Sequence, residues 1–408
     1  MVQIGEIYLG GKEGDPHNGN VFNCGVSYSL SEKSPVDGIY EFESGKWETE
    51  IQKNNQNIIA RCRDILTEEQ IITQGFEYCQ KYLDILSVTH KSQLMTQRPG
   101  QKYILLFSKE GRTFLRIISN ADFGFSLEAN LTVGDKNGNL IEPPPVPTLH
   151  WIPAFRYYRI SQSETDPYQA YQELYLAFEE LLQEIAPRRK REGESDWLLR
   201  ALSTVEQQIP LNTLLPNSQN PMAEIKEHHY KNFRCKLFHA KDGDYILPND
   251  CPNPKDLYKA YEELIMIWRQ IAFTFKNVPR KGGGLTYFGF MSMMDYLANC
   301  GVQMQFTDDL TPGNTSDTKI SPLEHPVYSS TKNEYIRDYS PGIALFKGTL
   351  ENPEQTGLTV IHRFGLVDKG ELVSIASYQD GIYIKGIDVL EGYETARLIN
   401  TASPKTIF

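Results

Sequence analysis

The sequence lacks the features of an exported, membrane-spanning or disulfide-rich protein. No run of about 18 apolar residues, the length that suggests a membrane-spanning helix, occurs in the chain. The first residues, MVQIGEIYLGGKEGD, contain no basic segment followed by an apolar run. The 6 cysteines are scattered singly without a C-x-x-C pair, so neither a disulfide framework nor a zinc site is indicated. We therefore expect a cytoplasmic protein with no membrane association.

Signatures of several enzyme classes are also missing. The stretches LGGKEG and KGGGLT fail the G-x4-G-K-[ST] spacing of a phosphate-binding loop, and G-x-S-x-G is absent. The paired carboxylates Glu179–Glu180 and Glu262–Glu263 are not accompanied by the E-x-x-H pairs of a di-iron site, so we interpret them as surface residues. His228 and His229 would point about 100° apart on a helix, which is poor geometry for one metal ion. No metal and no cofactor is expected.

What the sequence does contain is the composition of a folded globular protein with a negative net charge. Hydrophobic residues make up 40% and charged residues 23%, with 23 Tyr and 19 Phe, which excludes a disordered composition. The 408 residues correspond to roughly two or three domains. A net charge of -11 argues against broad adhesion to nucleic acid, although it leaves room for a small basic site.

Residues 1–145 are predicted to form an α+β domain. Apolar runs on either side of KEGR predict a β-hairpin with Gly111 in its turn. Residues 66–88 have helical spacing of apolar residues, and Thr67 with Gln70 forms a capping-box pattern at the start. The segment IEPPPVPTLHWIP, residues 141–153, interrupts regular structure and marks the first domain boundary.

Residues 153–305 are predicted to form a helical bundle. Residues 165–187 and 253–275 are both strongly amphipathic, and the first has a capping acceptor at Asp166 followed by Pro167. A shorter helix from Ser195 and the helix that carries HHYKNFRCKLFH lie between them. Four amphipathic helices with mostly short links favour an antiparallel arrangement.

Residues 325–408 are predicted to be β-rich. Strand-like runs occupy residues 342–350, 356–366 and 372–386, and Asp380–Gly381 in the last run predicts a hairpin turn. The overall expectation is an α+β multidomain fold. In it, a central antiparallel helical bundle is flanked by an N-terminal α+β domain and a β-rich C-terminal region.

The helix around residue 234 gathers basic side chains in an acidic protein. Lys231, Arg234, Lys236, His239 and Lys241 fall within eleven residues. On a helical projection of 100° per residue, Arg234 lies just outside the apolar face and His239 lies on the far side, about 140° from Arg234. One helix therefore does not bring both side chains to a single atom, whereas a second copy related by a two-fold axis would.

These residue types suit the cleavage of RNA without a metal. Histidine can accept a proton from a hydroxyl and return one to a leaving oxygen. Arginine offers a charged planar fork that matches phosphate oxygens and stabilises charge at phosphorus. RNA supplies its own nucleophile in the 2′-OH. Two copies of each residue at a dimer interface would provide a base, an acid and an anion clamp.

The hexapeptide RCKLFH, Arg234 to His239, resembles the R-x4-6-H signature of the HEPN superfamily. The resemblance extends over residues 155–300 or so, where the motif lies on the third of the four expected helices. It implies a HEPN-like helical bundle that dimerises through the motif helix and, in active members, cleaves RNA to leave a cyclic phosphate. By position, Arg234 would bind the scissile phosphate and His239 would be the acid/base residue. A toxin or anti-phage defence role is expected by the same association.

Two functions stay open. One is a metal-independent endoribonuclease that acts as a homodimer on RNA, with tRNA among the candidate substrates. The other is a catalytically silent binding or scaffold module for a nucleotide or a protein, because Cys235 occupies the position where active members carry a polar residue and a thiol hydrogen-bonds poorly. Further basic residues are either solvated or RNA-binding: Lys236, Lys241, Arg188, Arg189, Lys190 and Arg191.

Overall fold

The computed structural model describes residues 1–90, 93–97, 102–125, 134–141, 149–240, 243–279, 287–340, 342–400 and 404–406. The chain divides into two compact units. The first, which we call the strand-rich unit, comprises residues 1–123, 250–253 and 286–398. The second, the helical unit, comprises residues 124–249, 254–285 and 399–408.

Two large sheets form the strand-rich unit. The 6-stranded sheet has the order β10-β9-β13-β14-β1-β2 and the 9-stranded sheet the order β11-β12-β15-β8-β7-β3-β6-β5-β4. The strands are β1 (Val2–Ile4), β2 (Ile7–Gly10), β3 (Cys24–Ser29), β4 (Gly38–Phe42), β5 (Trp47–Ile51), β6 (Asn57–Cys62), β7 (Tyr103–Lys109), β8 (Arg112–Phe125), β9 (Gln303–Thr307), β10 (Val327–Ser329), β11 (Lys332–Ser340), β12 (Ile343–Glu351), β13 (Val360–Asp368), β14 (Glu371–Ile384) and β15 (Val389–Asn400). The pairs of strands whose register is known are antiparallel.

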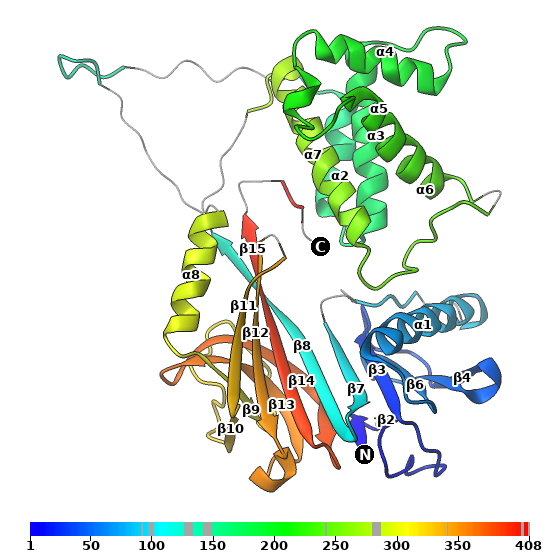
Figure 1. The fold of residues 1–408 in the computed structure, drawn as a ribbon, viewed down its shortest axis with the longest axis vertical. Helices are drawn as coiled ribbons and strands as arrows, with labels where there is room; N and C mark the ends of the chain where they lie inside the picture. Colours follow the sequence, from blue (N-terminus) through cyan, green and yellow to red (C-terminus); the bar gives the residue numbers. More distant parts are fainter. Residues whose placement is uncertain are drawn as a thin grey trace. The chain divides into compact units, whose positions relative to one another are not determined.

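Strands from the two ends of the chain pair within the same sheets. Gln3 of β1 lies opposite Tyr383 of β14. In the larger sheet β8 is the neighbour of β15, and Thr395 donates a hydrogen bond to the Ser119 carbonyl between them (Figure 1). The predicted fold class was therefore wrong, because the protein is sheet-rich and is not built around a central helical bundle with separate flanking regions. Periodicity identified strands, but it contains no information about partners several hundred residues away.

One long helix packs on the larger sheet. Helix α1 (Glu68–His90) shares an apolar core with β3, β5, β6 and β7. Its start is the predicted capping box, since Thr67 Oγ1 accepts a hydrogen bond from the Gln70 backbone and the Gln70 side chain accepts one from the Thr67 backbone. The hairpin at Gly111 is also confirmed, because Lys109 of β7 pairs with Arg112 of β8. Local signals of this kind fix individual elements.

The two sheets approach closely where glycine lies opposite a large side chain. A Cβ atom at Gly348 of β12 would lie 2.1 Å from the Met304 Cβ of β9. Phe306 of β9 approaches Gly392 of β15 in the same way. Met304 and Phe306 are fully buried, so they belong to the apolar layer that joins the sheets.

The predicted hairpin turn at Asp380–Gly381 was wrong. Strand β14 continues through both residues, but its pairing with β13 shifts between Ile361↔Ile382 and Arg363↔Ser377. The residues between Ser377 and Ile382 therefore form a bulge, and Gly381 has the positive φ of 73° that such a distortion uses. Asp-Gly suits a turn and a bulge equally, because both need a residue with positive φ.

The helical unit packs its helices around one apolar core. Its helices are α2 (Pro153–Ser163), α3 (Pro167–Ile185), α4 (Glu194–Glu206), the 3-10 helix η2 (Leu211–Thr213), α5 (Pro221–Ile225), the π-helical η3 (Lys226–Cys235), α6 (Lys236–Phe238) and α7 (Lys255–Lys276). Asp166 caps α3 by accepting a hydrogen bond from the Gln169 backbone, as predicted. Helix α7 runs beside α3, with Trp268 bonded to the Ala177 carbonyl and Lys276 paired with Glu184. A further helix, α8 (Tyr287–Asn299), belongs to the strand-rich unit.

Candidate functional site

The segment that carries the basic motif is a continuous helical run of three parts. It begins at α5, where the Asn220 side chain caps the helix, passes through the π-helix η3 and ends with α6. Every fourth residue is buried: Ile225, His229, Phe233 and Leu237. π-Helical turns are uncommon and occur frequently at functional sites. This segment is therefore a candidate for a functional role.

Arg234 lies in a cluster of charged side chains from three helices. Its guanidinium donates to Glu194 at the start of α4 and lies 3.7 Å from Glu179 of α3. The rings of Tyr230 and Phe238 lie 5.5 Å from the guanidinium carbon. Only 16% of the Arg234 side chain is exposed. The predicted phosphate ligand is thus already engaged by two carboxylates, and Glu179 is not the surface residue that we expected.

The Arg234 cluster holds two carboxyl groups against one guanidinium. Burial raises the pKa of Glu179 to about 7, and its hydrogen bond with Glu194 acts in the same direction, against the opposing effect of Arg234. A proton shared between the two carboxyl groups leaves little positive charge on the cluster near neutral pH.

His239 lies outside the helix. Phe238 is the last helical residue, and His239 has an extended backbone with φ -129° and ψ 101°. Its side chain is exposed. The Leu237 carbonyl, two residues earlier, accepts a hydrogen bond from the Gln172 side chain of α3. The helical projection that placed His239 relative to Arg234 therefore does not apply, because the helix ends before His239.

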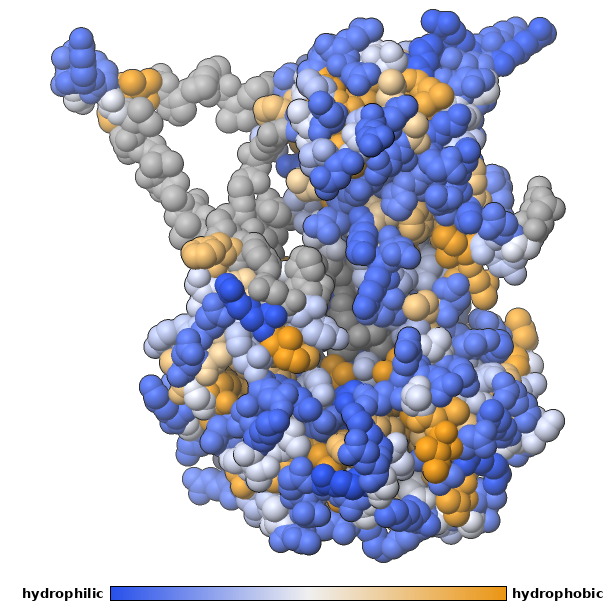
Figure 2. Space-filling view, viewed as in Figure 1, coloured by the Kyte–Doolittle hydropathy of each residue, from blue (hydrophilic) through white to orange (hydrophobic). Residues whose placement is uncertain are grey.

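The four basic residues Arg188–Arg191 form an exposed loop between α3 and α4, which we call the basic loop. Glu192 fixes its shape: the carboxylate accepts from the Arg189 backbone and from the Arg200 side chain, and the Glu192 carbonyl accepts from Arg188 Nε. The ion pair with Arg200 lowers the pKa of Glu192 to about 2. Hydrophilic residues largely cover the end of the helical unit that carries α4 (Figure 2). The basic side chains are thus presented to solvent on an anchored backbone.

The basic loop and His239 lie toward opposite ends of α3. The loop begins after Ala186, whereas the Leu237 carbonyl is bonded to Gln172, about 20 Å back along the helix at 1.5 Å per residue. Arg234 lies between the two, because its partner Glu179 is about midway along α3 between Gln172 and Ala186. One chain therefore keeps the basic loop and His239 apart, with Arg234 between them.

Of the two other lysines predicted to bind RNA, Lys236 and Lys241, the structure describes only the first. Lys236 forms an ion pair of 2.8 Å with Asp244, and 31% of its side chain is exposed. Lys241 lies outside the described residues. The ion pair of Lys236 adds no phosphate contact to the site.

His229 is a buried residue whose role the sequence analysis missed. Its Nε2 lies 2.7 Å from Glu263 Oε1 and its Nδ1 lies 3.0 Å from Tyr171 Oη. Burial lowers the pKa of His229, although Glu263 acts in the opposite direction. We therefore interpret it as a neutral imidazole that donates to Glu263 and accepts from Tyr171. The signal was its position four residues before Phe233, on the apolar face of the helix.

No protein-family model, curated protein or solved structure matches the chain. Within the residues that the structure describes, no group of three or more His, Cys, Asp or Glu side chains is arranged to hold a metal ion. No helix in the described part of the chain is long and apolar enough to cross a membrane.

Proposed function

We propose that the protein is a catalytically silent relative of the HEPN proteins, and that its helical unit binds RNA through the basic loop. The observation that carries this proposal is the ion pairing of Arg234 with Glu194 and Glu179. A guanidinium between two carboxylates offers no net positive charge to a scissile phosphate. Such a phosphate would have to displace both glutamates, and breaking a partly buried charge pair is costly.

The basic loop supplies the positive charge that the Arg234 cluster lacks. Arg188, Arg189, Lys190 and Arg191 are all exposed, and Glu192 fixes the backbone beneath them. Lysine and arginine side chains that face phosphates release counterions from the nucleic acid, which produces affinity without base recognition. A loop of four such residues suits contact with a phosphate backbone in a protein that is otherwise acidic.

The endoribonuclease is the second candidate, favoured by the exposure of His239 beyond the helix end. At this exposed position, the His239 side chain could contact a second copy of the chain. Glu179, with a pKa of about 7 at 3.7 Å from Arg234, would be an additional acid/base group in that arrangement. In this candidate the partner chain must draw Arg234 away from its glutamates.

The proposal is tested by measuring RNA binding and RNA integrity together in EDTA. Fluorescence anisotropy with a labelled single-stranded RNA compares the wild type with a double variant of the basic loop, Arg189→Gln with Lys190→Gln. We expect weaker binding and a salt dependence of log K that is less steep by about 1.4, since each phosphate contact on a single strand contributes about 0.7.

The matched control removes two charges at the other end of the helical unit. Lys255 and Lys259 are exposed near the start of α7, whose far end lies beside the end of α3. The variant Lys255→Gln with Lys259→Gln should bind RNA like the wild type. Equal binding by the loop variant and the wild type would refute the role of the loop. Cleavage that survives EDTA, leaves cyclic phosphate ends and disappears in His239→Ala would refute the catalytically silent module and support the endoribonuclease.

A further inference from the structure

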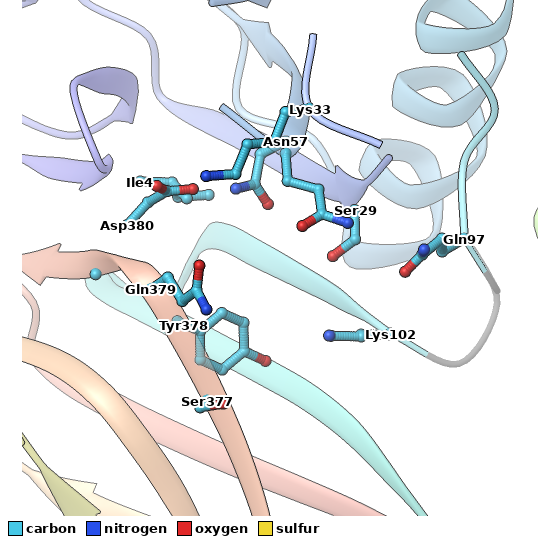
Figure 3. A pocket seen from close by; sticks show the side chains of 12 residues that line it. Ile4, Ser29, Lys33, Asn57, Gln97, Lys102, Ser377, Tyr378, Gln379 and Asp380 are labelled. Atoms are coloured by element: carbon cyan, nitrogen blue, oxygen red, sulfur yellow. The ribbon is translucent and has the colours of Figure 1, made fainter. Parts of the chain in front are cut away.

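A polar cavity of about 200 Å³ lies within the strand-rich unit at the bulge of β14. Figure 3 shows Lys33 and Asn57 on one wall, Gln379 and Tyr378 on the facing wall, and Lys102 pointing into the space between them. The lining residues come from β1, β3, β6, β14, the loop after β3 and the segments before β6 and β7: Ile4, Ser29, Lys33, Gln56, Asn57, Gln97, Lys102, Ser377, Tyr378, Gln379, Asp380 and Gly381. Segments far apart in the sequence thus converge on one space.

The character of the lining restricts what could bind. Two lysines face one aspartate, and nearly all the other side chains end in an amide or a hydroxyl, with Ile4 the aliphatic exception. Sites for drug-sized ligands are mostly apolar and typically occupy about 300–1,000 Å³. A smaller, polar and net positive cavity suits a small anion that also carries hydrogen-bonding groups.

The pairing of the strands determines where Lys102 and Tyr378 lie in the cavity. Tyr28 of β3 pairs with Tyr103 of β7, which sets Lys102 next to Ser29 at the end of these two interior strands of the larger sheet. The bulge turns Tyr378 and Gln379 of β14 toward the same space. The Lys102 ammonium lies 5.7 Å from the centre of the Tyr378 ring.

Two lining amides bond to the protein, whereas one lining hydroxyl does not. The side-chain amide of Gln56 donates to the Leu30 carbonyl, and that of Asn57 donates to Asn55. The hydroxyl of Tyr378, in contrast, is buried and has no hydrogen-bond partner in the described part of the chain. A buried hydroxyl without a hydrogen-bond partner destabilises the folded protein. Its presence beside a polar cavity therefore points to a ligand that forms the missing hydrogen bond.

We propose that this cavity binds a small phosphate monoester of the size of a sugar phosphate. The Lys33 and Lys102 ammonium groups would neutralise the phosphate, because lysine acts as a point-charge phosphate ligand. The Tyr378 hydroxyl and the Gln379 amide would bond the hydroxyl groups of the ester, and the Asp380 carboxylate would accept from one of them. This site is independent of the RNA-binding function proposed for the helical unit.

Isothermal titration calorimetry on the full-length protein tests the site with three probes: ribose 5-phosphate, inorganic phosphate and ribose. We expect saturable binding of ribose 5-phosphate, weaker binding of phosphate and none of ribose. Lys33→Met and Lys102→Met should each weaken ribose 5-phosphate binding about tenfold or more, as a charge-assisted contact is lost. Lys109→Met is the matched control, since Lys109 ends the same strand β7 about 20 Å from Lys102.

Tyr378→Phe separates a binding role from a structural one. The change removes only the unpartnered hydroxyl, so the melting temperature should stay the same or rise while the affinity for ribose 5-phosphate falls. The proposal is overturned if neither phosphate probe binds, or if binding is unchanged in both cavity lysine variants. It is also overturned if binding is lost in Arg189→Gln with Lys190→Gln, because the phosphate then binds to the basic loop.

Discussion

His229 and Glu263 are joined across the core of the helical unit, with 2.7 Å between His229 Nε2 and Glu263 Oε1. The imidazole is fully buried, and its other nitrogen contacts Tyr171. Since burial of a charge is unfavourable without full compensation, the neutral ring is the form that stabilises the fold. The pH dependence of unfolding should therefore report on this residue.

His229→Gln is expected to remove a loss of stability at acid pH. The pKa of His229 is lowered in the folded protein, so below about pH 6.5 the unfolded chain binds the proton more readily and stability falls as the pH falls. The free-energy difference between wild type and variant should shrink from pH 7 to pH 5. Urea unfolding followed by circular dichroism measures it. His17→Gln, at an exposed position, controls for the replacement, and a difference that does not change with pH would contradict the prediction.

Glu179→Gln is expected to have the opposite pH signature. Because the pKa of Glu179 is raised to about 7, the folded state holds its proton more tightly, and this stabilisation is lost as the pH rises through 7. The variant should gain stability relative to the wild type between pH 5 and pH 8, by on the order of 2 kcal/mol. Its amide still reaches Glu194.

The same urea series measures the Glu179 effect. Glu180→Gln is the matched control, one residue along the same helix and half-buried. If both glutamine variants show the same pH profile, the shared proton in the Arg234 cluster is excluded.

The elements that were predicted correctly depend on neighbours in the sequence. The capping box of Thr67 and Gln70 and the cap at Asp166 involve residues three apart, and the hairpin at Gly111 joins adjacent strands. The pairing of β1 with β14 joins residues about 380 positions apart, for which no local pattern exists. The overall fold was therefore wrong although many of its elements were right.

The candidate site shows the same limit. The projection placed Arg234 at the edge of the apolar face, which agrees with its partial burial, but its partners Glu179 and Glu194 lie on two other helices. The packing of the helices decides which carboxylates pair with Arg234, and this packing cannot be predicted from local patterns in a single sequence. The helix also ends before His239 without a glycine or proline at its end, so the sequence contained no signal for this end.

Arg61→Met is expected to destabilise the strand-rich unit by about 3–5 kcal/mol, the cost of breaking a buried ion pair. Arg61 is fully buried and pairs with Glu48, with Glu50 at 2.8 Å and with Asp15 at 3.6 Å. The change leaves three buried carboxylates without their cation. Differential scanning calorimetry measures the effect.

Arg63→Met is the control for Arg61. Arg63 follows β6 directly and is exposed, so its loss should cost less than about 1 kcal/mol. Similar losses for the two variants would show that the buried pairs contribute nothing beyond an exposed arginine.

Gly381→Ala is expected to destabilise the protein more than Gly386→Ala and to weaken ribose 5-phosphate binding. Both glycines have positive φ, 73° and 72°, so an alanine is strained by a similar amount, about 1 kcal/mol, at each position. A Cβ at Gly381 would also lie 2.6 Å from the His362 ring, whereas at Gly386 its nearest neighbour would be 3.6 Å away. The additional cost of about 1–3 kcal/mol comes from this overlap, which must move the bulge that lines the cavity. Thermal unfolding and calorimetric titration of the two variants measure both effects, and equal behaviour would show that the bulge requires a positive φ at Gly381 but not the absence of a side chain.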